Sequence, residues 1–148
     1  MFTIEEKEVL KHAEKIIQSK IKNIDAFNNP TLVKRFCENK LAHEEREVFC
    51  VLFLDNQNRL IKDENIFYGT IDSASIYPRE ILKMALNLNA KSVILSHNHP
   101  SGIAEPSQAD RRITVRIQDA LNFIDMRVLD HIIVGHGDVI SFAEKGWI

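Results

Sequence analysis

The stretch that decides the fold is residues 92–110, which read SVILSHNHPSGIAEPSQAD. The run begins as an apolar strand, expected over residues 91–96, and continues directly into His97 and His99. A proline and a glycine follow and predict a loop, because these residues break regular structure. The loop ends in a serine and an aspartate that begin a helix, expected over residues 107–123. A strand, a loop and a helix thus bring many potential ligands into a short stretch.

The first candidate ligands are His97 and His99. Residues two apart in an extended strand point to the same face, so both imidazoles can reach one ion at about 2.0–2.1 Å. The loop turns the chain back, so Asp110 can supply a third, oxygen ligand. Two histidines, a carboxylate and an open position are typical of a catalytic zinc site, where the metal lowers the pKa of bound water. The sequence therefore predicts one zinc ion per chain, held by His97, His99 and Asp110.

The serine and the aspartate also have the spacing of a helix capping box. In such a box the Ser107 hydroxyl accepts a hydrogen bond from the backbone amide of Asp110, and the carboxylate accepts one in return. Taken alone, this pair is more commonly a cap than a functional site. The two roles are compatible for Ser107, whose hydroxyl can cap the helix and face the site. They compete for Asp110, although its carboxylate has two oxygens.

A hydrolytic metal site also needs a base. Three glutamates precede the first apolar strand, expected over residues 47–54, and Glu47 is the best candidate because it lies immediately before the buried run. A carboxylate at a strand end can reach a site on the neighbouring strand. A solvated surface charge is an equally good interpretation of this glutamate from the sequence alone.

The order of the expected elements predicts the fold class. The remaining helices are expected over residues 3–21, 31–41 and 78–88, and the remaining strands over 47–54, 59–69, 127–134 and 139–142. Helices, then a hairpin, then alternating strands and helices indicate an α/β or α+β sandwich with a mixed sheet. We divide the chain into an N-terminal helical lead-in, residues 1–29, and one domain, residues 30–148.

Composition sets the broad class of the protein. Its 148 residues are 45% hydrophobic and 27% charged, with a net charge of -2, as in ordinary soluble domains. Such a charge gives no general attraction to nucleic acid. Cys37 and Cys50 have no CxxC spacing and are expected to be reduced, buried thiols, which favours a cytoplasmic location. We see no signal peptide and no apolar run that could span a membrane, so no membrane partner is expected.

Several runs along the chain complete a recognisable pattern. They are EVFCVLFLD at 47–55, GTIDSAS at 69–75, YPRE at 77–80, HNHPSG at 97–102, SQAD at 107–110 and DHIIVG at 130–135. From about Thr31 onward the chain resembles the RadC-like members of the JAB/MPN metalloprotease superfamily. The signature of that superfamily, often called JAMM, is an upstream glutamate, then His-x-His-Pro, then Ser-x-x-Asp.

The resemblance implies a fold and an activity. The fold is a JAB/MPN domain, similar to the cytidine-deaminase-like sandwich, with a mixed sheet flanked by helices. The zinc ligands it implies are His97, His99 and Asp110, with water as the fourth. Glu47 corresponds to the general acid/base that activates this water, and Ser107 to a donor that stabilises the oxyanion. The implied reaction is hydrolysis of a peptide or isopeptide-linked protein substrate.

Two other functions remain open. Longer RadC proteins carry an N-terminal helix-hairpin-helix region, and residues 1–29 lack its glycine-rich hairpins, so the chain resembles a short form. A DNA-repair-associated or DNA-binding accessory protein, with or without nuclease activity, is supported only by Arg112 and Arg116, which share a helix face that is more simply explained as solvated. A non-catalytic interaction domain is disfavoured because all the ligands are present. His131, in an apolar strand, is expected to be a core or supporting histidine.

Overall fold

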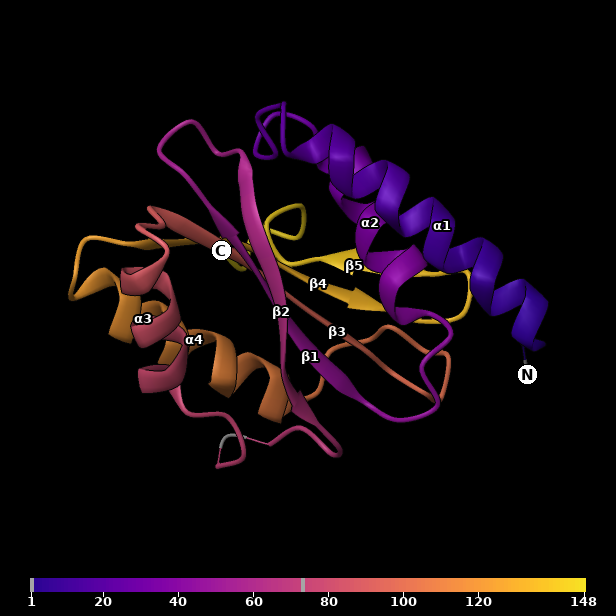
Figure 1. The fold of residues 1–148 in the computed structure, drawn as a ribbon. Coiled ribbons are helices and arrows are strands. Elements are labelled where there is room, and N and C mark those ends of the chain that lie inside the picture. Colours follow the sequence, from indigo (N-terminus) through magenta and orange to yellow (C-terminus); the bar gives the residue numbers. More distant parts are fainter. Residues whose placement is uncertain (1, 73) are drawn as a thin grey trace.

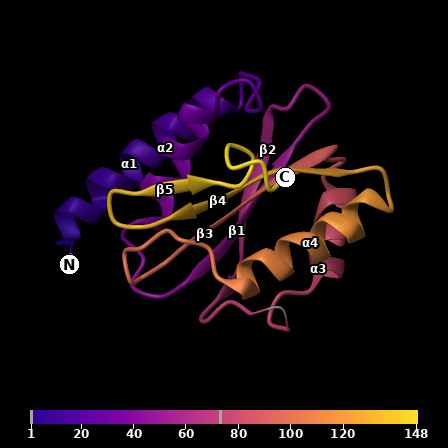
Figure 2. The same cartoon turned by 180° about the vertical axis from the view of Figure 1, so that it is seen from behind.

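A five-stranded mixed sheet lies between two pairs of helices in the computed structural model, which describes residues 2–72 and 74–148 (Figures 1 and 2). The predicted mixed sheet flanked by helices is therefore confirmed. The strand order is β2-β1-β3-β4-β5. The elements, in chain order, are α1 (Ile4–Ile21), α2 (Pro30–Leu41), β1 (Val48–Leu54), β2 (Leu60–Tyr68), α3 (Pro78–Asn87), β3 (Ser92–Asn98), α4 (Gln108–Asn122), β4 (Arg127–Val134) and β5 (Val139–Ser141).

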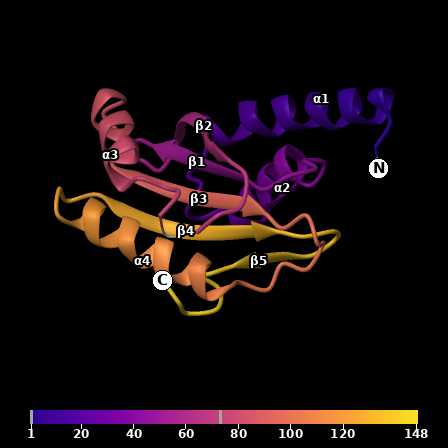
Figure 3. The same ribbon diagram turned by 90° about the horizontal axis from the view of Figure 1, so that it is seen from below.

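The pairing of the strands decides where the site can form. The hairpin of β1 and β2 is antiparallel, β1 also pairs antiparallel with β3, and β4 pairs antiparallel with β5. Among the strand pairs of the described residues, only β3 and β4 are parallel, and α4 connects them, as parallel neighbours require a crossover. The carboxyl end of β3 and the start of α4 are joined by one loop, so they lie at the same edge of the sheet (Figure 3).

The central strand β1 is buried along its whole length, as the sequence predicts. Its side chains alternate between two cores, because successive residues of a strand point to opposite faces. Phe49, Val51 and Phe53 pack in the cluster that includes residues of α3 and α4. The residues between them pack with α2 and the end of α1. Strand β3 divides its side chains in the same way, and this places His97 on the α4 side.

Helix α1 begins with a capping box, in which Thr3 and Glu6 exchange hydrogen bonds of 2.8 and 3.1 Å. The apolar residues of this helix recur at helical spacing, but only part of the stripe they form is buried. The side chains of Ile4, Val9 and Ile16 are 78, 68 and 49% exposed. The helix packs on α2 and buries only a narrow side, so apolar residues next to that side stay in water.

One boundary near the site differs from the expectation. Strand β3 runs to Asn98 rather than Ser96, because His97 and Asn98 continue to pair with Ile133 and Val134 of β4. The first histidine is therefore fixed inside the sheet rather than in a loop.

No helix among the described residues is both long enough and apolar enough to cross a bilayer.

Candidate metal centre

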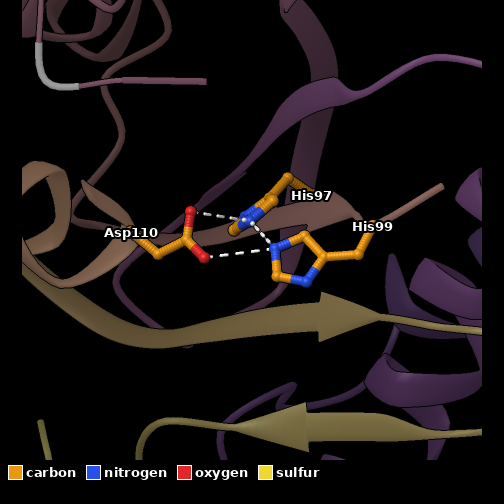
Figure 4. A group of neighbouring side chains, drawn as sticks. All are labelled: His97, His99 and Asp110. Carbon is orange, nitrogen blue, oxygen red and sulfur yellow. Dashed lines mark hydrogen bonds and ion pairs between the residues drawn. The ribbon is translucent and has the colours of Figure 1, made fainter. Parts of the chain in front are cut away.

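The three predicted ligands meet at one point at the edge of the sheet (Figure 4). The Asp110 carboxylate places Oδ1 3.1 Å from Nε2 of His97 and Oδ2 3.1 Å from Nε2 of His99. The two Nε2 atoms are also 3.1 Å apart. One nitrogen of each histidine and the carboxylate of the aspartate therefore face one another.

The fold brings these side chains together from two elements. His97 lies on β3 beside Phe49 of β1, and its ring stacks on the Phe49 ring with centroids 5.9 Å apart. His99 follows the strand, and its amide extends the ladder by donating to the carbonyl of Val134 at 2.8 Å. Asp110 occupies the third position of α4. The predicted convergence of strand end and helix start is what the structure shows.

The geometry of the cluster fits a zinc ion. Two ligands bound at 2.0–2.1 Å around a tetrahedral ion are about 3.3–3.4 Å apart, close to the 3.1 Å separations seen here. Two imidazole nitrogens and a carboxylate are also the ligand types of a catalytic zinc site. The side chains of His97 and Asp110 are buried, and that of His99 is 12% exposed, so the cluster opens to solvent on the side of His99.

The charges of the cluster favour a cation. Burial raises the pKa of Asp110, but hydrogen bonds from His97 and His99 outweigh it and hold that pKa well below the usual range of a carboxyl group. The carboxylate is therefore ionised at neutral pH. Burial lowers the pKa of His99, and the hydrogen bond to Asp110 and the carbonyl of Ile103 outweigh that effect and raise it. The site thus attracts positive charge.

A fourth polar side chain, His131, lies behind the ligands. Its Nε2 is 2.8 Å from Nδ1 of His97, and its Nδ1 is 2.6 Å from the hydroxyl oxygen of Thr114. The Thr114 hydroxyl in turn donates to the main-chain carbonyl of Asp110 at 2.6 Å. His131 is fully buried, and this burial, together with the nearby His97, lowers its pKa well below the usual value. It contacts His97 and lies outside the cluster of three.

Two supporting residues escaped the sequence analysis. Thr114 is four residues after Asp110 on α4, a spacing that could have indicated its contact with that turn. Asn98 lies between the two histidines, and its side chain points to the other face of the sheet. It accepts a hydrogen bond from the amide of Val48 at 2.7 Å and donates to the carbonyls of Arg46 at 3.0 Å and Glu44 at 3.3 Å. No local sequence signal indicates these contacts, because they join segments about fifty residues apart.

The candidate base, Glu47, lies next to β1, beside the ligands but outside the cluster of three. The pairing of Phe49 with His97, continued by two residues, places Glu47 across from His99. Its charge is one of the groups that raise the pKa of His99, which agrees with this placement. The Glu47 carboxylate is half-buried and accepts a hydrogen bond from the amide of Ile71 at 2.6 Å.

The predicted capping box at the start of α4 is present. The Ser107 hydroxyl accepts from the amide of Asp110 at 3.0 Å, and the Asp110 carboxylate accepts from the amide of Ser107 at 2.8 Å. Ser107 is exposed, and a hydroxyl that accepts one hydrogen bond can still donate its own proton. The cap and the contacts of Asp110 with the two histidines therefore coexist, as the two oxygens of the carboxylate allow.

The loop that follows His99 is held by a close backbone approach. The ring of His99 bonds through Nδ1 to the carbonyl of Ile103 at 2.8 Å, so the loop orients this ligand. A Cβ atom added at Gly135 would lie 2.4 Å from the carbonyl oxygen of Gly102. Glycine at 135 therefore lets the end of β4 support the loop directly.

Comparison with known proteins agrees with this geometry. A family model described as "RadC-like JAB domain" matches residues 27–147. Among curated proteins, UPF0758 proteins of Vibrio vulnificus (strain YJ016) and Vibrio atlanticus (strain LGP32) are each 56% identical over 140 residues, and one of Aliivibrio fischeri (strain MJ11) is 53% identical. Each alignment covers 95% of this chain and 62% of the relative.

The matched region includes every residue of the site. It extends across the base candidate Glu47, the ligands on β3 and α4, and His131 on β4. The identity to the relatives covers nearly the whole chain, although the chain spans less than two thirds of their length. Sequence motifs, fold and site geometry thus lead to the same assignment, and the chain belongs to the RadC-like JAB domain family.

Proposed function

We propose that this domain is a zinc-dependent hydrolase of the metallopeptidase or isopeptidase type. The observation that carries the proposal is the convergence of His97, His99 and Asp110 in zinc-like geometry, with Glu47 immediately before the neighbouring strand β1. Three protein ligands and one open position distinguish a catalytic zinc site from a structural one, which is closed by four protein ligands.

Each residue has a role that its position supports. Zinc held by the three ligands would act as a Lewis acid that polarises a carbonyl and lowers the pKa of water. Glu47 takes the proton of the attacking water and passes it to the leaving amine. The Ile71 amide, which donates to Glu47 at 2.6 Å, orients the carboxylate. The exposed hydroxyl of Ser107 donates to the oxygen that becomes negative in the tetrahedral transition state.

The test begins with the metal. We expect protein purified without added metal to contain or take up about one zinc ion per chain, and His97→Ala and Asp110→Ala to lose most of it, because each substitution removes a ligand. Glu47→Gln keeps the ligands and should keep the zinc. A screen of peptide and isopeptide-linked substrates should show cleavage by the native protein, reduced by at least about 100-fold in Glu47→Gln.

Two results would contradict the proposal. One is a native protein that binds no zinc on titration. The other is cleavage by Glu47→Gln at the native rate. Retention of zinc by Glu47→Gln is the control that separates loss of a base from loss of the metal.

The DNA-associated alternative depends on the basic residues of α4. Arg112 and Arg116 are exposed on this helix, whereas Arg111 lies over the ring of Trp147, 3.9 Å from its centroid. Exposure is equally consistent with a solvated face. Salt-dependent DNA binding that is lost in an Arg112→Glu/Arg116→Glu variant would favour the alternative, and a lack of binding at low salt would count against it.

A further inference from the structure

We propose that Thr114 and His131 are positioning residues that select the tautomer of His97 and so direct its Nε2 lone pair at the metal. The inference rests on the metal centre proposed above and goes beyond its ligand set. It concerns a hydrogen-bonded chain of four residues, Asp110, Thr114, His131 and His97, which begins and ends at the metal centre. All four side chains are buried, with at most 2% of any residue exposed, so water does not compete for these bonds.

The first hydrogen bond determines which group donates and which accepts in all the others. The Thr114 hydroxyl lies 2.6 Å from the main-chain carbonyl of Asp110, and a carbonyl oxygen can only accept. The hydroxyl proton is therefore used in this bond. Thr114 can then only accept from the ring of His131, whose Nδ1 is 2.6 Å away. This requires the proton of His131 to be on Nδ1.

The second half of the hydrogen-bonded chain follows from the surroundings of His131. Its ring is fully buried, and its two nitrogens contact a hydroxyl and an imidazole rather than a carboxylate, so the ring is neutral and carries one proton. Because that proton is on Nδ1, Nε2 of His131 is an acceptor, and Nδ1 of His97 must donate to it across 2.8 Å. The nitrogen of His97 that remains for a metal is Nε2, which faces Asp110. The chain thus fixes the ligand nitrogen without touching the metal.

The two ligand histidines reach the same state by different routes. His99 donates from Nδ1 to the carbonyl of Ile103, a backbone acceptor that cannot reverse its role. His97 depends on another histidine, and that histidine could adopt either tautomer. Thr114 removes this freedom, because its hydroxyl is anchored on the same turn of α4 that supplies the Asp110 ligand. One residue, Asp110, therefore binds the metal with its side chain and orients His97 with its main chain.

The matched variants are Thr114→Val and Thr114→Ser. Valine keeps the shape of threonine but has no hydroxyl, so a proton on Nδ1 of His131 would be buried without an acceptor. His131 is then expected to move its proton to Nε2 and donate to His97, which leaves the wrong His97 nitrogen for the metal. Serine keeps the hydroxyl and should restore the native arrangement.

Zinc affinity is the first readout, measured by competition with a chromogenic chelator. Loss of partners behind the ligands typically costs 10–100-fold in metal affinity. We expect a loss of about 10–100-fold in Thr114→Val and no more than about threefold in Thr114→Ser. Urea unfolding of both variants gives the fraction of folded protein. The measured zinc affinity is corrected by this fraction, so that a lower stability is not mistaken for weaker binding. Equal zinc affinity of Thr114→Val and the native protein would overturn the inference.

A second readout does not depend on metal. Long-range ¹H–¹⁵N NMR correlations of the metal-free protein in chelator report whether Nδ1 of His97 carries a proton. Without a metal, Nε2 of His97 faces the Asp110 carboxylate and donates to it in every variant, so Nδ1 is the informative nitrogen. We expect a proton on Nδ1 in the native protein and in Thr114→Ser, and none on Nδ1 in Thr114→Val. An unchanged tautomer in Thr114→Val would refute the inference even if zinc binds. A native protein that shows the expected tautomer and binds no zinc would refute the proposed function and leave the selection of the tautomer intact.

Discussion

Replacement of Asn98 by alanine should weaken the protein, although this side chain faces away from the metal centre. Asn98 is buried, with 3% of its surface exposed, and its amide joins the strand that carries the ligands to the segment that carries Glu47. It accepts from the amide of Val48 at 2.7 Å and donates to the carbonyls of Arg46 at 3.0 Å and Glu44 at 3.3 Å.

The expected cost follows from these bonds. Each hydrogen bond contributes about 0.5–1.5 kcal/mol, and a buried group left without a partner costs about 1–3 kcal/mol. The amide of Val48 loses its partner inside the protein, whereas the two carbonyls lie closer to solvent. We therefore expect Asn98→Ala to lower the free energy of unfolding by about 2–4 kcal/mol. The segment that carries Glu47 should also become less well positioned, so activity should fall more than zinc content.

Urea unfolding followed by circular dichroism, in the presence of chelator, measures this cost without any contribution from metal. Asn87→Ala is the matched control, because Asn87 is exposed on α3, and it should change the free energy of unfolding by no more than about 0.5 kcal/mol. If Asn98→Ala matches that control, the reasoning from buried hydrogen bonds is refuted. Asn98→Asp keeps the acceptor for Val48 and removes both donors, so a native-like stability of this variant would also contradict the argument.

Two further predictions concern the loop and the thiols. Gly135→Ala places a Cβ 2.4 Å from the carbonyl oxygen of Gly102, so the two backbone segments must separate. Urea unfolding should then show a free energy of unfolding lower by about 1–3 kcal/mol, and zinc binding should be weaker. An unchanged free energy of unfolding together with unchanged zinc binding would contradict the close approach. Burial raises the pKa of the Cys37 thiol to about 12 and that of Cys50 well above its usual value, so at pH 8 both are protonated as well as buried. A disulfide reagent should therefore react slowly with the native protein and rapidly with two thiols per chain in urea, and fast reaction of either native thiol would show that the core opens there.

Local patterns predicted the cluster of His97, His99 and Asp110 and the elements that carry it. The spacing of His97 and His99, and the capping box that ends in Asp110, depend on residues close together in the chain, so their geometry is set by strand and helix periodicity. Glu47 was a candidate base from its place before a buried strand, and the resemblance to a known family implied its role; its position beside the cluster depends on the register between β1 and β3. A hairpin and a central buried strand were likewise visible as patterns of apolar residues.

The supporting contacts could not be predicted in the same way. His131 reaches His97 only because β3 and β4 are parallel neighbours, and Thr114 reaches His131 only because α4 crosses over both strands. The exposed apolar residues of α1 show that burial, too, depends on contacts between distant segments that local patterns do not predict. Periodicity defines an apolar stripe, but the partner that covers it, here a single helix, decides how much of the stripe is buried.

The shared carboxylate at the start of α4 also bears on how metal would enter and leave. Oδ2 of Asp110 lies 2.8 Å from the amide of Ser107 and 3.1 Å from the ring of His99, so one oxygen serves both the helix end and the ligand cluster. Helix ends fray at a much smaller free energy than global unfolding requires. Opening of the first turn of α4 would withdraw one ligand while the two histidines stay in place on the sheet. The rate of metal exchange would then be governed by local fraying, and protection of the Ser107 and Asp110 amides from hydrogen exchange would report the occupancy of the site.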